Sequence, residues 1–137
     1  MTFSVSRGIA ASAEEVWALL TDTRKWPEWG PSITGVDPAA GTPQPGWPAA
    51  GNPAAGLALG SRGRVRTVLG AALPYTVTAF EPGRYWAWSV AGVPATGHRV
   101  VPRDGGCLVT FTVPWWAPAY LPVCAVALRR IERLAAA

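Results

Sequence analysis

The chain has 137 residues, of which 50% are hydrophobic and 15% are charged, and its formal net charge is +4. This content excludes a disordered chain, and a chain of this length buries roughly two-thirds of its unfolded surface as one domain. A net charge this small does not indicate a class of binding partner by itself. Its first residues lack the basic and long apolar segments of a secretory signal. We therefore expect a single cytoplasmic domain over residues 1–137.

The N-terminal part predicts a strand, two short helices and a second strand. The segment "TFSVSR" alternates apolar and polar residues as a half-buried strand does. A helix is expected to begin at Ser12, because Glu15 three positions later completes a capping box. Asp22 and Thr23 are expected to cap a second helical turn, "TRKWPEW", which ends at Gly30 and Pro31 before the short strand "SITGVD".

Residues 38–60 interrupt the regular pattern. This segment is uncharged and rich in Pro, Gly and Ala, so it cannot bury enough apolar area to order itself. A loop of this length inside a compact domain is typical of a lid, a binding loop or a flexible insertion. Trp47 stands alone in the segment and is its candidate anchor.

Five strands and a long helix are expected after the loop. The strands are "SRGRVRTVLG", "LPYTVTAF", "RYWAWSV", "ATGHRVVP" and "CLVTFTVP", and the turns "EPG" and "RDGG" indicate antiparallel hairpins. A helix is expected over residues 119–135, because apolar residues recur there at spacings of 3 and 4: Leu121, Cys124, Leu128, Ile131 and Ala135. This order predicts an α+β fold with the helix against a curved sheet.

The uncharged segment 105–128 is long enough to cross a bilayer, but its prolines argue against insertion. Pro114, Pro118 and Pro122 would each remove a helix hydrogen bond in adjacent turns, which a membrane does not tolerate. No stable membrane insertion is expected. The two cysteines, Cys107 and Cys124, form no CxxC pattern and are expected to be buried free thiols.

Several segments resemble a known superfamily. The stretch "ASAEEVWALLTDTRKWPEWGPSITGV" resembles the N-terminal signature of the START-like (SRPBCC) superfamily, especially its polyketide cyclase/dehydrase branch. The segments "FEPGRYWAW" and "GHRVVPRDGG" look like that branch's central strands, and residues 38–60 look like an insertion. The resemblance implies a helix-grip fold, with a curved antiparallel sheet of about six to seven strands around a long C-terminal helix.

In a helix-grip fold, the two short helices after the first strand close one end of the gap between sheet and helix. Trp17, Trp26 and Trp29 would plug that end. Two interpretations are open for them. They are structural core residues, or one of them contacts a ligand directly.

The gap between a curved sheet and one helix is a natural site for a small apolar ligand. Strand alternation predicts an aromatic, nearly uncharged lining. The expected lining residues are Val65, Thr67, Tyr75, Val77, Trp86, Trp88, His98, Val100, Val109, Phe111, Tyr120, Leu121, Cys124 and Leu128. The preferred occupant would be a flat or elongated apolar molecule with one or two oxygens.

His98 is the only histidine, and three roles are open for it. It is held by the backbone at the cavity wall, it contacts a ligand, or it acts as a general base. Tyr75 is the other weak catalytic candidate. The sequence offers few metal ligands: one His, two Cys and eight acidic residues, none of them at the spacing of a metal-binding motif. Neither a metal nor a cofactor is therefore expected.

Arg62, Arg64 and Arg66 share one face of an expected strand. This pattern indicates a solvated outer face or contact with an acidic partner. No aromatic residues interleave with the arginines, as they do in proteins that bind single-stranded nucleic acid, so no nucleic-acid partner is expected.

Three functions are compatible with the sequence. The first is binding of a small hydrophobic molecule, such as a lipid or an aromatic or polyketide-like compound, by a monomer or a homodimer. The second is a metal-free polyketide cyclase or dehydratase, as the resemblance allows. The third is a partner-binding domain with a collapsed cavity. The scarcity of acid–base groups favours the first.

Overall fold

The computed structural model describes residues 2–38, 57–115 and 117–136. Its strands are β1 (Thr2–Ile9), β2 (Ile33–Pro38), β3 (Arg62–Thr67), β4 (Ala72–Glu81), β5 (Tyr85–Val90), β6 (Val93–Arg103) and β7 (Gly106–Pro114). They form one antiparallel sheet in the order β1-β7-β6-β5-β4-β3-β2. The helical elements are α1 (Ala13–Thr21), α2 (Trp26–Trp29), the 3-10 turn η1 (Pro118–Tyr120) and α3 (Leu121–Ala136).

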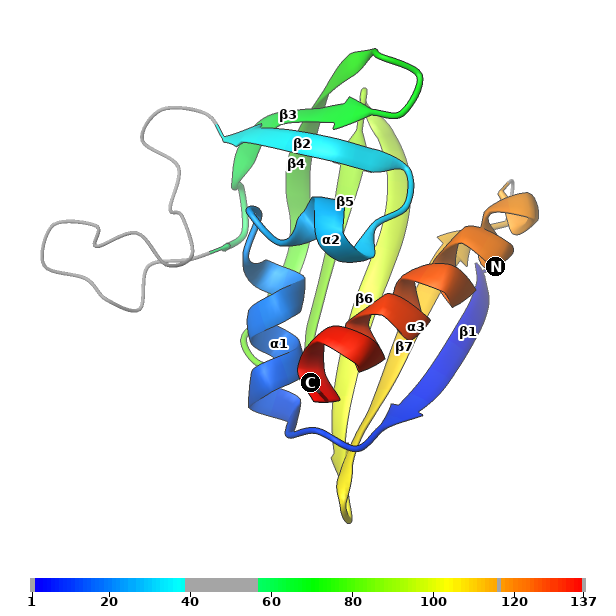
Figure 1. Ribbon diagram of the computed structural model, residues 1–137. Helices are drawn as coiled ribbons and strands as arrows, with labels where there is room; N and C mark the ends of the chain where they lie inside the picture. The colour runs from blue at the N-terminus through cyan, green and yellow to red at the C-terminus, as the bar shows by residue number, and fades with distance from the viewer. Residues whose placement is uncertain (1, 39–56, 116, 137) are drawn as a thin grey trace, which may run out of the picture.

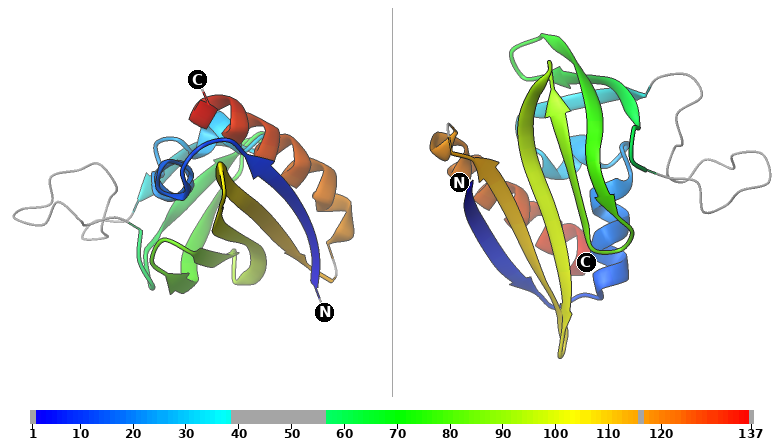
Figure 2. Two further views of the ribbon diagram at one scale, coloured as in Figure 1. Left: turned by 90° about the horizontal axis from the view of Figure 1, so that it is seen from below. Right: turned by 180° about the vertical axis from the view of Figure 1, so that it is seen from behind.

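The helices all lie on the concave face of the described sheet (Figures 1 and 2). Helix α3 crosses this face and packs mainly against β1, while α2 lies between β2 and α3 (Figure 1). The predicted helix-grip architecture is confirmed. None of the helices in the described ranges is both long and apolar enough to cross a bilayer.

Local capping explains how the chain enters the two short helices. The Ser12 hydroxyl accepts a hydrogen bond of 3.1 Å from the Glu15 backbone N–H, so α1 begins where the sequence predicts. The prediction that Asp22 and Thr23 cap the second helix is wrong, because the N-cap of α2 is Lys25 and no side chain caps it. Asp22 ends α1 instead, and its carboxylate accepts hydrogen bonds from the Arg24 backbone N–H at 3.0 Å and from the Arg24 guanidinium.

Tight turns connect the central strands. The β6–β7 hairpin turns at Asp104 and Gly105, as the "RDGG" segment predicts. The β5–β6 hairpin turns at Ala91 and Gly92, where φ is +54° and +79°. Two positive φ angles are typical of a type I′ turn. Ala91 is the only residue other than glycine with a positive φ in the part of the chain that the structure describes.

The strand faces show the expected alternation most clearly on β7. Cys107, Val109, Phe111 and Val113 are buried, and the residues between them are partly exposed. The exposed side chains of Arg62, Arg64 and Arg66 lie on the opposite face of the sheet from the core residue Val65. Both cysteines are buried and free, as predicted.

The expected 38–60 loop, with Trp47 and its interpretation as a lid, falls mostly on residues 39–56, which lie outside the described residues. Of the expected loop, Pro38 ends β2 and Leu57 is a buried core residue.

Candidate functional site

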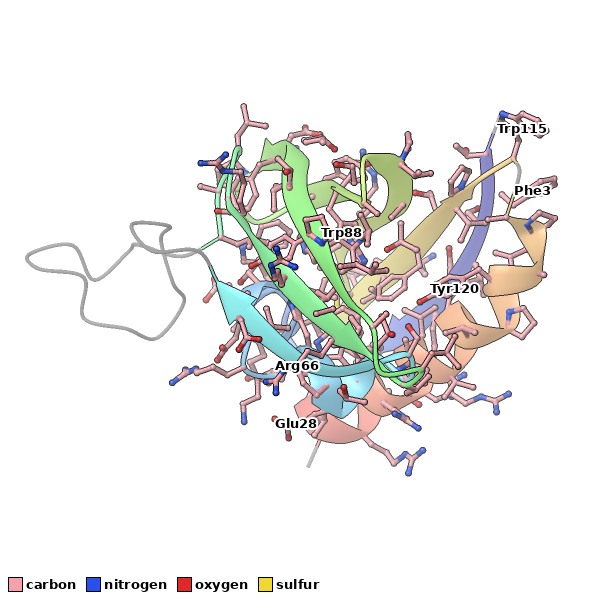
Figure 3. The ribbon with its side chains drawn as sticks, turned by 90° about the horizontal axis from the view of Figure 1, so that it is seen from above. Phe3, Glu28, Arg66, Trp88, Trp115 and Tyr120 are labelled. Atoms are coloured by element: carbon pink, nitrogen blue, oxygen red, sulfur yellow. The ribbon has the colours of Figure 1, made fainter. Side chains whose placement is uncertain are left out.

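The gap between the sheet and α3 has two ends of different character. We call the end beside α1 and α2 the closed end. The open end lies at the β3–β4 and β5–β6 turns and at η1, and Figure 3 is seen from this side. It shows Trp88 on β5 and Tyr120 on η1, with Trp115 and Phe3 at the outer corner.

Stacked aromatic rings fill the closed end. Trp26 of α2 stacks on Trp86 of β5 with centroids 5.2 Å apart and an interplanar angle of 9°. His98 of β6 stacks on Trp86 from another side, with centroids 3.9 Å apart and an angle of 24°. Trp88 and Tyr75 meet Trp26 edge-on. We call these five residues the aromatic cluster.

The indole N–H of Trp26 explains why α2 sits where it does. It donates a 2.8 Å hydrogen bond to the Leu20 carbonyl in the last turn of α1. The indole of Trp29 donates in the same way to the Leu19 carbonyl at 2.8 Å. These bonds satisfy carbonyls that a helix end leaves free, and they tie α2 to α1 above the sheet. Trp26 and Trp29 are buried, and Trp17 is partly buried against the core.

A short hydrogen-bond chain sets the state of His98. The Trp88 indole, which can only donate, donates to Thr96 Oγ1 at 3.0 Å. The Trp86 carbonyl can only accept, so His98 Nδ1–H donates to it at 3.2 Å. Nε2 of the neutral ring then accepts the proton of the Thr96 hydroxyl at 3.0 Å. Both ring nitrogens are used within the protein.

The imidazole of His98 is consequently neutral. Burial lowers its pKa to about 3, with a smaller opposing contribution from the hydrogen bond to the Trp86 carbonyl. A neutral ring with no free lone pair cannot take a proton from a substrate. This geometry matches the first of the three roles considered, a histidine held by the backbone at the cavity wall.

Between the aromatic cluster and α3 lies a small inner cavity. Its volume is about 30 Å³, which is room for one or two water-sized groups. It is lined by Trp26, Trp29, Gly30, Pro31, Ser32, Ile33, Trp86, Trp88, Thr96, His98, Phe111, Tyr120, Val123, Cys124 and Ala127.

At the open end the gap widens into an outer groove of about 440 Å³. It is lined by Ser32, Ile33, Val65, Thr67, Val68, Leu69, Ala71, Leu73, Trp88, Val90, Ala95, Thr96, Val113, Pro114, Ala117 and Tyr120. None of these described lining residues carries a charge. The groove is apolar except for a few hydroxyl groups.

One hydroxyl pair marks the boundary between the two spaces. Ser32 Oγ and Tyr120 Oη are 2.6 Å apart and hydrogen-bonded, and both residues line the cavity and the groove. Burial is the main cause that raises the pKa of Tyr120, and the hydrogen bond with Ser32 partly opposes it. The pair joins the segment after α2 to η1.

Two buried polar atoms have no hydrogen-bond partner within the described part of the chain, the Trp86 indole Nε1 and the Tyr75 hydroxyl. Burial raises the pKa of Tyr75 to about 12 and that of Cys124 to about 11. Near neutral pH these two groups are an uncharged phenol and an uncharged thiol, and neither is an activated nucleophile or base.

The sequence matches the family described as "Polyketide cyclase / dehydrase and lipid transport" over residues 1–135. The chain belongs to this family. None of the curated proteins compared with it shows significant similarity.

Solved structures share the fold of this family member at low sequence identity. Protein MLL2253 from Mesorhizobium loti is 17% identical with a TM-score of 0.71, covering 98% of this chain and 96% of that one. XoxI from Bacillus cereus is 15% identical with a TM-score of 0.70, covering 98% and 94%. The Aha1 dimer from Colwellia psychrerythraea is 17% identical with a TM-score of 0.66, covering 98% and 96%. These likenesses show the fold alone.

The structure divides the expected lining residues of this polyketide cyclase/dehydrase family protein into four groups. Trp88 and Tyr120 line both spaces, Val65 and Thr67 line only the groove, and Trp86, His98, Phe111 and Cys124 line only the inner cavity. The remaining six line neither space and belong to the core or pack against it: Tyr75, Val77, Val100, Val109, Leu121 and Leu128.

Sequence reasoning missed part of the groove. Leu73 and Val90 continue the alternation of Tyr75 and Trp88 toward the open end, so extending the pattern to the strand ends would have found them. Ser32 and Ile33 had no such signal. They reach the site because Gly30 ends α2 and turns the chain back toward the sheet.

Proposed function

We propose that this protein binds a small, uncharged apolar molecule in the outer groove. The observation that carries the proposal is the groove itself, about 440 Å³ of apolar space without a charged lining residue in the described chain. Ligand pockets usually measure about 300–1,000 Å³ and combine apolar walls with a few polar points. The family description, which includes lipid transport, supports the same class of ligand.

The groove offers little for a cyclase or dehydratase. Such an enzyme needs an acid or base with a suitable pKa near the reacting carbonyl. The described lining supplies the hydroxyls of Ser32, Thr67, Thr96 and Tyr120 and a histidine that burial keeps neutral. Binding without turnover is therefore the function that this geometry supports best. The third function, binding of a protein partner, assumed that side chains fill the cavity. They fill only the closed end, and the groove of about 440 Å³ at the open end argues against this function.

A neutral fluorescent probe tests the proposal. N-phenyl-1-naphthylamine should bind the wild-type protein with a blue-shifted rise in its fluorescence. Ala95→Trp places an indole on the groove wall and should weaken binding at least about tenfold, because it fills the space that the probe needs. Val101→Trp is the matched control, since it adds the same group to an exposed position of β6 that lines neither the cavity nor the groove.

Circular dichroism should show that both variants are folded. Equal affinity of Ala95→Trp and wild type would place the probe elsewhere and reject the groove as the binding site. Light scattering on the same samples separates a monomer from a homodimer, the state that the Colwellia Aha1 neighbour is described as adopting. A cytoplasmic location stays a prediction from the sequence.

A further inference from the structure

We infer that the inner cavity receives the carbonyl oxygen of a neutral ligand whose apolar body lies in the outer groove. This inference rests on the proposed function and names the class of molecule that the site prefers. The ligand would be an apolar ketone, ester or similar carbonyl compound, bound with its oxygen toward the closed end.

The two spaces are neighbours with a common wall. Ser32, Ile33, Trp88, Thr96 and Tyr120 line both of them. A ligand in the groove thus lies against the boundary of the inner cavity. The hydrogen-bonded hydroxyls of Ser32 and Tyr120 stand at this boundary, so a polar atom passing it would meet hydrogen-bonding groups.

The inner cavity is so small that only a small group of the ligand can enter it. About 30 Å³ has room for one or two water-sized groups and not for an alkyl chain or a ring. A carbonyl oxygen at the end of a larger apolar body has the required size.

Trp86 provides the hydrogen-bond donor. Its side chain is fully buried, lines the inner cavity, and its Nε1–H has no partner in the described chain. Trp26 and His98 stack on its ring, with their centroids 5.2 Å and 3.9 Å from that of the indole. Nε1–H is the only polar group of that ring and can only donate. A buried donor without a partner is unfavourable, and a carbonyl oxygen would satisfy it.

The absence of charge in the described lining selects a neutral ligand over an acid. Neither the inner cavity nor the outer groove is lined by a lysine or arginine among the residues that the structure describes. His98, which lines the inner cavity, is neutral, because burial lowers its pKa to about 3. A carboxylate buried here would lose its hydration without gaining a cation, which is costly.

Three ligands of one shape test the inference: 2-acetylnaphthalene, 2-ethylnaphthalene and 2-naphthoate. Calorimetric titration should give the ketone an affinity about tenfold higher than that of the hydrocarbon, from one recovered hydrogen bond. The carboxylate should bind more weakly than the ketone. In ¹⁵N spectra of the wild-type protein, the Trp86 indole N–H resonance should move downfield with the ketone and not with the hydrocarbon.

Trp86→Phe serves to assign that resonance and should remove the preference for the ketone. Trp115→Phe, at a residue 66% exposed and outside both linings, should keep it. If Trp86→Phe fails to fold, the affinities of the wild-type protein for ketone and hydrocarbon decide the question alone, and equal affinities overturn the inference. Equal affinities for ketone and hydrocarbon with an unmoved Trp86 resonance would overturn the inference and leave the proposed function standing. Binding of none of the three would overturn both.

Discussion

The closed and open ends of the grip are built from similar residues and have opposite properties. At the closed end, Trp26 and Trp29 reach down from α2 and are buried, and only about 30 Å³ is left beside them. At the open end none of the described helices covers the sheet in this way. Leu69 is 93% exposed and Trp115 is 66% exposed there, and the groove measures about 440 Å³. The comparison teaches that the covering element, rather than the strand residues, decides whether an apolar strand face becomes core or binding site.

The largest expected effect comes from removing the ring that closes one end. Trp26→Ala should lower the free energy of unfolding by about 3–5 kcal/mol, because a fully buried indole and its hydrogen bond to Leu20 are lost. Urea denaturation measures the change. Trp115→Ala at the open end is the control and should stay within about 0.5 kcal/mol of wild type. Similar losses in the two variants would show that the two ends do not differ in packing.

The second prediction uses the pKa of His98 to test whether the closed end excludes water. Its folded pKa of about 3 lies below the unfolded value of 6.5, so the unfolded chain binds the proton more readily. Stability is therefore complete above about pH 6.5 and falls as the pH drops toward the folded pKa. Between pH 7 and pH 5 the loss should be about 2 kcal/mol.

Urea denaturation of wild type and His98→Gln at both pH values checks this. The variant lacks the titrating ring and should lose much less stability over the same interval. An equal loss in the two proteins would mean that other groups cause the pH dependence and that His98 is accessible to protons in the folded state.

The smallest effect is expected at the β5–β6 turn of the open end. Ala91 holds a φ of +54°, a conformation that costs an L-residue roughly 1–2 kcal/mol. Ala91→Asn should raise the free energy of unfolding by about 1 kcal/mol, because asparagine followed by glycine suits this turn. Thermal and urea unfolding measure the gain. Ala91→Val should be destabilising, and a stable valine variant would show that the turn is not under this constraint.

Much of the fold was predictable because it depends on local patterns. The alternation around Val109 and Phe111, the capping of α1 by Ser12 and the hairpin at Gly105 all follow from residues close together in the sequence. The order of elements then leaves few arrangements in which one long helix covers a curved antiparallel sheet. The helix-grip architecture was accordingly predicted from the sequence and is confirmed.

The candidate site was predictable only in part. Alternation identifies the face of each strand that points inward, and thus Trp86, Trp88 and His98. It gives no information on how far a ligand can penetrate between that face and a helix. Tyr75 and Val77 lie on the inward face and yet line neither space. The second helix was also mispredicted at its start, because Asp22 forms local hydrogen bonds with Arg24 in place of a cap.

The sequence by itself determined the strands, the helices, their order and the apolar character of the gap, since propensity, capping and hydrophobic period act over a few residues. Only the tertiary structure decided where the gap is filled and where it is open. Trp26 meets Trp86 across 60 positions of the chain, and Ser32 meets Tyr120 across 88 positions. Contacts over such separations depend on the path of the whole chain. Local sequence patterns therefore do not determine which side chains fill the gap between the sheet and α3.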